Sequence, residues 1–102
     1  MVLSDRWLRT FVAVAESGSF TAAGRRLGVG QPAVSHAISR LESTLGVRLV
    51  ERSSRGLDLT PAGIFLHDRL AAAFADVDAA LRTVSADASS NVVTLSVSTS
   101  LA

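Results

Sequence analysis

The chain has 102 residues, with ten Lys or Arg, nine Asp or Glu and no cysteine. A chain of this length can bury one modest hydrophobic core, and a second full domain would not fit. Without cysteine it has neither a disulfide framework nor a thiolate metal site, which suits the reducing cytosol. The charge is uneven, because residues 1–60 hold eight arginines and five acidic residues, whereas residues 61–102 hold two arginines and four acidic residues.

We expect no export signal at the N-terminus, because Asp5, Arg6 and Arg9 interrupt its apolar run. No stretch reaches the roughly 18 consecutive apolar residues that a membrane-spanning helix needs. We therefore expect a cytoplasmic protein that has no membrane partner.

Two helices are expected in the first part of the chain. Ser4 is a favourable N-cap for the first helix, which Gly18 ends. Its apolar residues recur at helical spacing at Leu8, Phe11, Val12 and Ala15. Ser19 or Thr21 begins a short second helix that ends at Gly28.

A turn with two glycines, Gly28-Val29-Gly30, separates the second helix from a third. Gly30 occupies the N-cap position of that helix, Pro32 lies in its first turn and Gly46 closes it. Two helices joined by a three- or four-residue turn, often with glycine, are typical of the helix-turn-helix unit, whose second helix enters the DNA major groove. Double-stranded DNA is therefore the leading candidate partner.

The third helix has two distinct faces. Its apolar stripe comprises Val34, Ile38, Leu41 and Leu45, which fall within roughly 60° of one another. The opposite side is small and polar, and it carries Pro32, Ser35, His36, Ser39, Arg40 and Ser43. Such a face can approach base edges closely. Considered alone, it fits an ordinary solvated helix surface equally well.

A β-hairpin is expected directly after the third helix. Residues 47–51 and 57–60 have the pattern of two short strands, and the polar turn between them spans residues 52–56. A hairpin in this position is a wing. We expect Arg52 and Arg55 at its tip, where they would contact phosphate or the minor groove.

A long helix is expected to begin at Thr60-Pro61 and to end near residue 85. Its heptad seam comprises Leu70, Phe74, Val77, Leu81 and Val84. We expect Ile64 and Phe65 to pack on the winged-helix core and His67 to pack along the seam. A helix of about 25 residues spans roughly 37 Å, too long for the preceding module to cover, so a second copy of the chain is the expected cover.

The end of the chain has a different pattern. Residues 85–91 have the composition of a linker, and polar and apolar residues alternate over 92–101 as in a half-buried strand. One strand without a sheet is incomplete. We therefore expect it to be the first strand of a sheet-containing domain that this sequence lacks.

Residues 8–63, LRTFVAVAESGSFTAAGRRLGVGQPAVSHAISRLESTLGVRLVERSSRGLDLTPAG, resemble the DNA-binding domain of LysR-type transcriptional regulators. The resemblance implies a mainly α fold, in which a winged helix-turn-helix precedes a long dimerisation (linker) helix and the first strand of a missing α/β effector domain. The implied division is 1–60 for DNA binding, 61–85 for the linker helix and 86–102 for the hinge and that strand.

The resemblance also assigns DNA contacts residue by residue. Gln31, Pro32, Ser35 and His36 match positions of the recognition helix that meet base edges and backbone, and Arg52 and Arg55 match the wing. Gly30 stands where serine is usual, so a capping hydroxyl is lost, and His36 stands where arginine is common. With the outward face added, the expected DNA-binding residues are Gln31, Pro32, Ser35, His36, Ser39, Arg40, Arg52 and Arg55.

The function expected is that of a sequence-specific transcriptional regulator that binds an interrupted palindrome as a homodimer or a homotetramer. A small-molecule effector would act only through the missing C-terminal domain. Two alternatives are a MarR-like winged-helix repressor and a dimerisation module that does not bind DNA. We expect no enzyme, metal or cofactor, because His36 and His67 are the only histidines and the sequence has no nucleophilic triad or Gly-rich phosphate loop.

Overall fold

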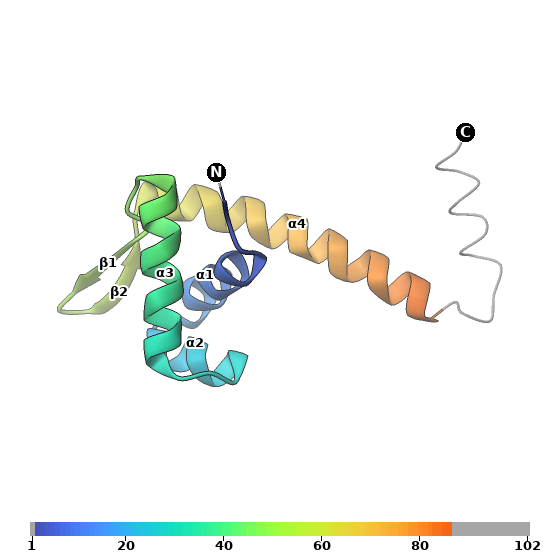
Figure 1. The fold of residues 1–102 in the computed structure, drawn as a ribbon, viewed down its shortest axis with the longest axis horizontal. Helices are drawn as coiled ribbons and strands as arrows, with labels where there is room; N and C mark the ends of the chain where they lie inside the picture. Colours follow the sequence, from blue (N-terminus) through green and yellow to red (C-terminus); the bar gives the residue numbers. More distant parts are fainter. Residues whose placement is uncertain (1, 87–102) are drawn as a thin grey trace. The chain divides into compact units, whose positions relative to one another are not determined.

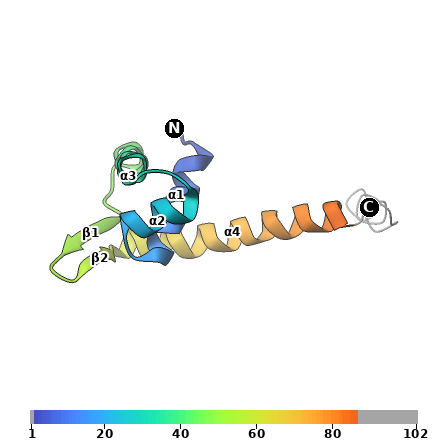
Figure 2. The same ribbon diagram turned by 90° about the horizontal axis from the view of Figure 1, so that it is seen from below.

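A computed structural model describes residues 2–86. Figures 1 and 2 show its elements, which in chain order are α1 (Asp5–Ser17), α2 (Phe20–Leu27), α3 (Gln31–Leu45), β1 (Val50–Ser53), β2 (Gly56–Leu59) and α4 (Pro61–Ala86). The expected mainly α winged helix-turn-helix with a long following helix is confirmed. The linker from residue 87 and the strand expected over 92–101 lie outside the described residues.

The chain divides into two compact units between Ala71 and Ala72, so the first unit holds the three short helices, the hairpin and the first turns of α4. In both ribbon views the hairpin and α1 lie on different sides of α3 (Figures 1 and 2). The described part of the second unit is the remainder of α4, from Ala72 to Ala86.

Local capping signals set the ends of the first helices. The Ser4 hydroxyl accepts a hydrogen bond from the backbone N–H of Arg6 at 3.2 Å, and Gly18 ends α1 in the left-handed region. Ser19, rather than Thr21, caps α2, because its hydroxyl accepts from the N–H of Ala22 at 3.0 Å. These bonds satisfy donors that have no partner inside the helix.

The turn between α2 and α3 depends on a close backbone approach. The Val29 N–H donates to the carbonyl of Gly24 at 2.9 Å. A Cβ atom at position 24 would lie 2.7 Å from the Val29 carbonyl oxygen, so glycine is required for the turn to fold back on α2. Gly30 then caps α3 without a side-chain hydrogen bond, as the sequence indicated.

The core of the first unit lies between α1, α3 and the segment before the hairpin. Its largest fully buried side chains are Phe11, Val14, Val34, Leu41 and Leu49. Ile38 is also buried, so three members of the expected α3 stripe are confirmed as core, whereas Leu45 is half-buried and packs against it. The apolar stripe of α3 thus fixes which face of this helix is left for solvent.

The hairpin is shorter and begins later than expected. Val50 pairs with Leu59 and Ser53 with Gly56, so Arg52 lies within β1 opposite Leu57, and the tip is only Ser54-Arg55. The prediction that Arg52 lies at the tip is therefore wrong. Residues 47–49 have no strand opposite them, because β2 ends at Leu59 and α4 begins at Pro61.

The start of α4 packs tightly on the other elements of the first unit. The Thr60 hydroxyl donates to the Arg48 carbonyl at 2.7 Å and accepts from the Gly63 N–H at 3.0 Å. Gly63 lies against the backbone of Leu49, where a Cβ atom would overlap the Leu49 carbonyl oxygen. Thr60 thus joins the end of the hairpin to the first turn of the helix.

The exposed fractions of Ile64 and Phe65 are 52% and 61%, so these residues do not pack on the core. The prediction that they pack there is wrong. Ala62, Leu66 and Leu70 pack there instead. The approach of Gly63 to the backbone turns the Leu66 and Leu70 face inward, and at 100° per residue Ile64 and Phe65 lie roughly 130° from that face.

Apolar side chains of α4 in the second unit are exposed. Val77, Leu81 and Val84 have exposed fractions of 44%, 62% and 57%, and Phe74 is half-buried. Of the helices between residues 2 and 86, none is long and apolar enough to cross a membrane.

Candidate nucleic-acid interface

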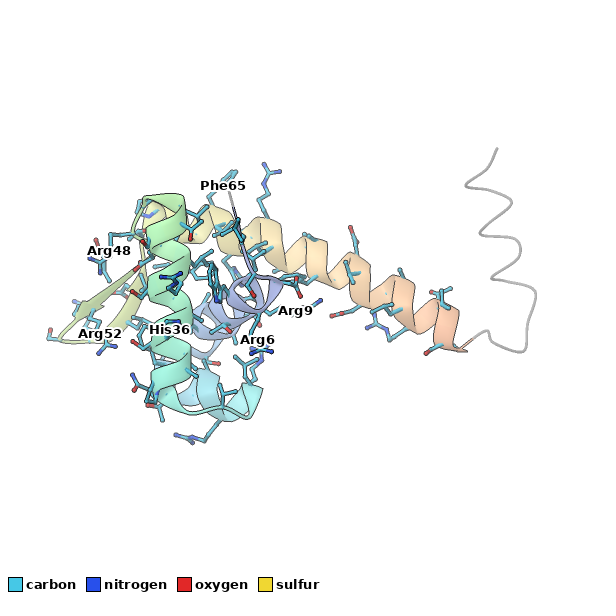
Figure 3. All side chains as sticks on the ribbon, viewed as in Figure 1. Arg6, Arg9, His36, Arg48, Arg52 and Phe65 are labelled. Atoms are coloured by element: carbon cyan, nitrogen blue, oxygen red, sulfur yellow. The ribbon has the colours of Figure 1, made fainter. Side chains whose placement is uncertain are left out.

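The solvent face of α3 is the one that the sequence predicted. Its exposed side chains are Gln31, Pro32, His36, Ser39, Arg40 and Ser43. Ser35 is half-buried at the edge of this face. Figure 3 shows His36 on α3 between labelled arginines on its two sides, with Arg48 and Arg52 on the hairpin side. Apart from His36 and Arg40, the side chains from Pro32 to Ser43 on this face are small, so the helix can approach base edges closely.

One flank of α3 faces the hairpin. A hollow beside the helix start is lined by Phe20, Gln31 and Arg52, and a second one further along is lined by Ser35, Ser39 and Arg52. The Arg52 guanidinium carbon lies 4.7 Å from the centroid of the Phe20 ring. Arg52 is thus held beside the recognition helix.

Arg55 occupies the tip of the wing, as predicted. Its backbone N–H donates to the Ser53 hydroxyl at 3.2 Å, and that hydroxyl donates to the Asp58 carboxylate at 3.4 Å. These contacts order the backbone of the tip and do not involve the Arg55 guanidinium. The two wing arginines therefore have different surroundings.

The other flank of α3 faces α1. The Arg40 guanidinium carbon lies 5.8 Å from the centroid of the Trp7 ring. A groove on this side is lined by Arg6, Trp7, Ala33 and Ala37. Basic side chains therefore border the solvent face of the recognition helix on both sides.

Glu42 connects the recognition helix to the base of the wing. Its carboxylate accepts hydrogen bonds from the N–H of Leu49 at 2.7 Å and of Val50 at 3.2 Å, and lies 3.5 Å from the Nε of Arg48. Only 15% of the Glu42 side chain is exposed. Sequence reasoning missed this residue, although a lone acid beside the apolar stripe of α3 is a signal that could have found it.

A second ionic cluster joins α1, α2 and the start of α4. Glu16 accepts from Arg26 at 2.9 Å, and Nε2 of His67 lies 3.2 Å from the same carboxylate. Hydrogen bonds from His67 and then Arg26 hold the pKa of Glu16 below its usual value. His67 is half-buried, and its Nδ1 lies 3.2 Å from Asp68. In the described part of the chain no three His, Cys, Asp or Glu side chains form a metal-binding group.

The predicted dimerisation residues have two kinds of surroundings. Leu70 packs on the core of its own unit, whereas Val77, Leu81 and Val84 are exposed and Phe74 is half-buried. The last four share one side of α4 at the spacing of a heptad seam. A role of these residues in dimerisation stays a prediction, as does DNA contact by the residues of α3 and the wing.

Comparison with known families gives one match that covers most of the first unit. The model described as bacterial regulatory helix-turn-helix protein, lysR family, matches residues 6–64. Among curated relatives, the HTH-type transcriptional regulator TfdS of Cupriavidus pinatubonensis is 58% identical over 64 residues, which are 62% of this chain and 22% of the relative. The uncharacterized regulator YfeR of Shigella flexneri is 43% identical over 82 residues, 80% of this chain and 27% of the relative.

Solved structures agree with these sequence matches. The BenM_DBD in its complex with catB site 1 DNA has a TM-score of 0.78 at 39% identity, over 85% of this chain and 98% of that one. CbnR, a LysR family transcriptional regulator, has a TM-score of 0.73 at 37% identity, over 82% of this chain and 29% of that one. The chain spans about a quarter of the length of the curated relatives.

Proposed function

The chain belongs to the lysR family of bacterial regulatory helix-turn-helix proteins, and we propose that it is a transcriptional regulator that binds an interrupted palindrome in double-stranded DNA. This family is the one that residues 8–63 predicted, and it replaces the MarR-like alternative. In the proposed complex, α3 enters the major groove and the wing contacts the adjacent backbone or minor groove.

The observation that carries this proposal is the exposed polar face of α3 with arginines on both flanks. Gln31 lies in the first turn, where its amide can form a bidentate pair with adenine, and Ser35, His36 and Ser39 follow along the helix. Arg40, Arg52 and Arg55 supply positive charge around this face. Base contact by the centre and phosphate contact by the rim is the division of roles found in protein–DNA interfaces.

We further propose a homodimer, or a dimer of dimers, that pairs through α4. The support is the exposed row of Val77, Leu81 and Val84, with Phe74 at its near end. Apolar residues at heptad spacing are stabilised when a second helix covers them. Two copies would place two recognition helices in successive major grooves, about 34–36 Å apart, which is why an interrupted palindrome is the proposed target.

The proposed organisation keeps residues 1–60 for DNA binding, 61–85 for dimerisation and 86–102 for a hinge and the first strand of an effector domain. Control by a small molecule would act through that domain. The support for this larger organisation is the family itself, together with curated relatives about four times as long as the part that they share with this chain.

The remaining alternative is a dimerisation module without DNA binding, and a salt titration separates the two. Fluorescence anisotropy of a labelled duplex is measured with the purified chain over a series of salt concentrations. For a protein that binds DNA phosphates, the logarithm of the affinity falls linearly with the logarithm of the salt concentration. The slope is roughly 0.9 per phosphate contacted. We expect a slope of several units, and an unchanged anisotropy at micromolar protein would favour the dimerisation module.

A further inference from the structure

Two arginines at the edges of the solvent face of α3 each lie over an aromatic ring from a different helix. Arg40 of α3 lies 5.8 Å from the centroid of Trp7 on α1, and Arg52 of β1 lies 4.7 Å from the centroid of Phe20 on α2. Within residues 2–86 neither guanidinium takes part in an ion pair. Both arginines are exposed, and both rings are half-buried and pack against the core. Each ring is thus a fixed support for a charge at the surface.

The two pairs lie on opposite flanks of the recognition helix. Arg52 and Phe20 line a hollow together with Ser35 and Ser39, and Trp7 lines a groove together with Ala33 and Ala37. At 100° per residue, the Ser35–Ser39 edge and the Ala33–Ala37 edge of α3 are roughly 160° apart. A helix in the major groove has one phosphate backbone on each side, since the groove is about 12 Å wide.

A stacked guanidinium is well suited to bind phosphate. Its flat face rests on the ring while its N–H donors point outward in the plane, where they can form two parallel bonds to an anion. The stack also restricts a long side chain before binding, so less conformational freedom is lost when phosphate binds. Arg55, at the wing tip, has no ring contact of this kind within the described residues.

We propose that Trp7 and Phe20 are positioning residues that hold Arg40 and Arg52 for the phosphates of the two DNA strands bordering the major groove. This inference rests on the proposed function, because it needs α3 in that groove. It assigns Arg52 to the phosphate beside the recognition helix and leaves the wing tip to Arg55.

The stacks are tested first in the free protein. Ring currents shift the side-chain proton resonances of a stacked arginine, so those of Arg40 and Arg52 are expected upfield of those of Arg55 in NMR spectra. Trp7→Leu should abolish the shift of Arg40 alone, and Phe20→Leu that of Arg52 alone. Resonances of Arg40 and Arg52 that coincide with those of Arg55 would overturn the stacked arrangement.

The role in binding is tested by duplex affinity as a function of salt. Arg40→Gln and Arg52→Gln should each reduce the salt slope by about one, because each removes one phosphate contact. Trp7→Leu and Phe20→Leu should each weaken binding roughly two- to fivefold, the size of an exposed cation–π contact. Each of these losses should vanish when the matching arginine is already Gln. Trp7→Phe keeps an aromatic face and should retain the affinity.

Phe20 also packs on the core, so a second variant protects the test against misfolding. Arg52→Lys keeps the charge and the apolar contacts, and it should keep the salt slope while losing affinity. Phe20→Leu combined with Arg55→Gln is the matched control, and its two effects should be additive.

Three outcomes of the binding experiments would also overturn the proposal. One is wild-type affinity for Arg52→Lys, another is additivity of each ring variant with its own arginine variant, and the third is an unchanged salt slope for Arg40→Gln and Arg52→Gln while the parent chain binds. If the parent chain binds no duplex, the proposed function itself fails and the phosphate role fails with it, even where NMR shows both stacks.

Discussion

Replacing Glu42 by Ala is expected to destabilise the protein by disconnecting the wing from the recognition helix. The change leaves the N–H groups of Leu49 and Val50 without their acceptor, and these residues are only 1% and 4% exposed. A buried donor left unpaired costs about 1–3 kcal/mol, and the Leu49 bond, at 2.7 Å, is the stronger of the two. We therefore expect a loss of about 2–4 kcal/mol in the free energy of unfolding, a large part of the roughly 5–15 kcal/mol of a typical domain.

The loss is measured by urea denaturation followed by circular dichroism. Glu51→Ala is the matched control, because it removes an acid from an exposed position of β1 and should cost less than about 0.5 kcal/mol. The urea midpoint of Glu42→Ala should fall well below that of the control, with a similar slope of the transition. Equal midpoints for the two variants would refute the idea that the Glu42 carboxylate holds the wing in place.

Four further predictions concern the interface, the dimer and pH. Val77→Asp should give a monomer by analytical ultracentrifugation at micromolar concentration, because it buries an unpaired charge in the seam. Ala79→Asp, on the opposite face of α4, should remain a dimer. A monomeric parent chain would rule out the dimer. Arg55→Ala should weaken binding to all duplexes by a similar factor and lower the salt slope by about one, and an unchanged slope would remove Arg55 from the interface. Gln31→Ala should weaken the binding free energy for duplexes with the preferred base pair by about 1–3 kcal/mol and leave nonspecific binding almost intact. An equal loss across a panel of operator variants would make Gln31 a positioning residue. Because the pKa of Glu16 is lowered, its ionised form stabilises the fold above the usual pKa of 4.5, and this stabilisation is lost as pH falls through the lower native pKa. Glu16→Gln should therefore lower the urea midpoint at neutral pH but not in acid, and a pH-independent difference would contradict the assignment.

The helices of the first unit could be predicted from the sequence because their determinants are local. Helix α1 is capped by Ser4 and Gly18, and α3 by Gly30 and Gly46. In each case neighbouring residues set the backbone conformation of the cap. Helical periodicity then identified three of the four buried residues of α3, namely Val34, Ile38 and Leu41, and missed Ala37. These signals extend over a few residues, so a single sequence contains them.

The errors arose where contacts distant in sequence decide the outcome. The hairpin begins at Val50 because its partner strand ends at Leu59, just before α4 begins, and the Leu49 N–H donates to the carboxylate of Glu42 on α3. Ile64 and Phe65 face solvent because the approach of Gly63 to Leu49 sets the rotation of α4. Strand propensity and apolar spacing alone do not contain these contacts.

The candidate site shows the same division. The outward face of α3 followed from its periodicity, and the position of Arg55 followed from the turn signal. The contacts of Arg40 with Trp7 and of Arg52 with Phe20 could not be predicted, because each joins side chains from separate elements. The sequence therefore predicts Arg52 at the tip of the wing, whereas in the structure it lies beside the recognition helix.

Sequence-specific binding of double-stranded DNA can be measured by sequencing the duplexes that the purified protein retains from a random library. The proposed function predicts enrichment of an interrupted palindrome whose half-sites are about one helical turn apart, or a multiple of one turn. It also predicts that Gln31→Ala relaxes the preference at a defined position of each half-site. Retained duplexes with the base composition of the starting library would contradict sequence-specific binding.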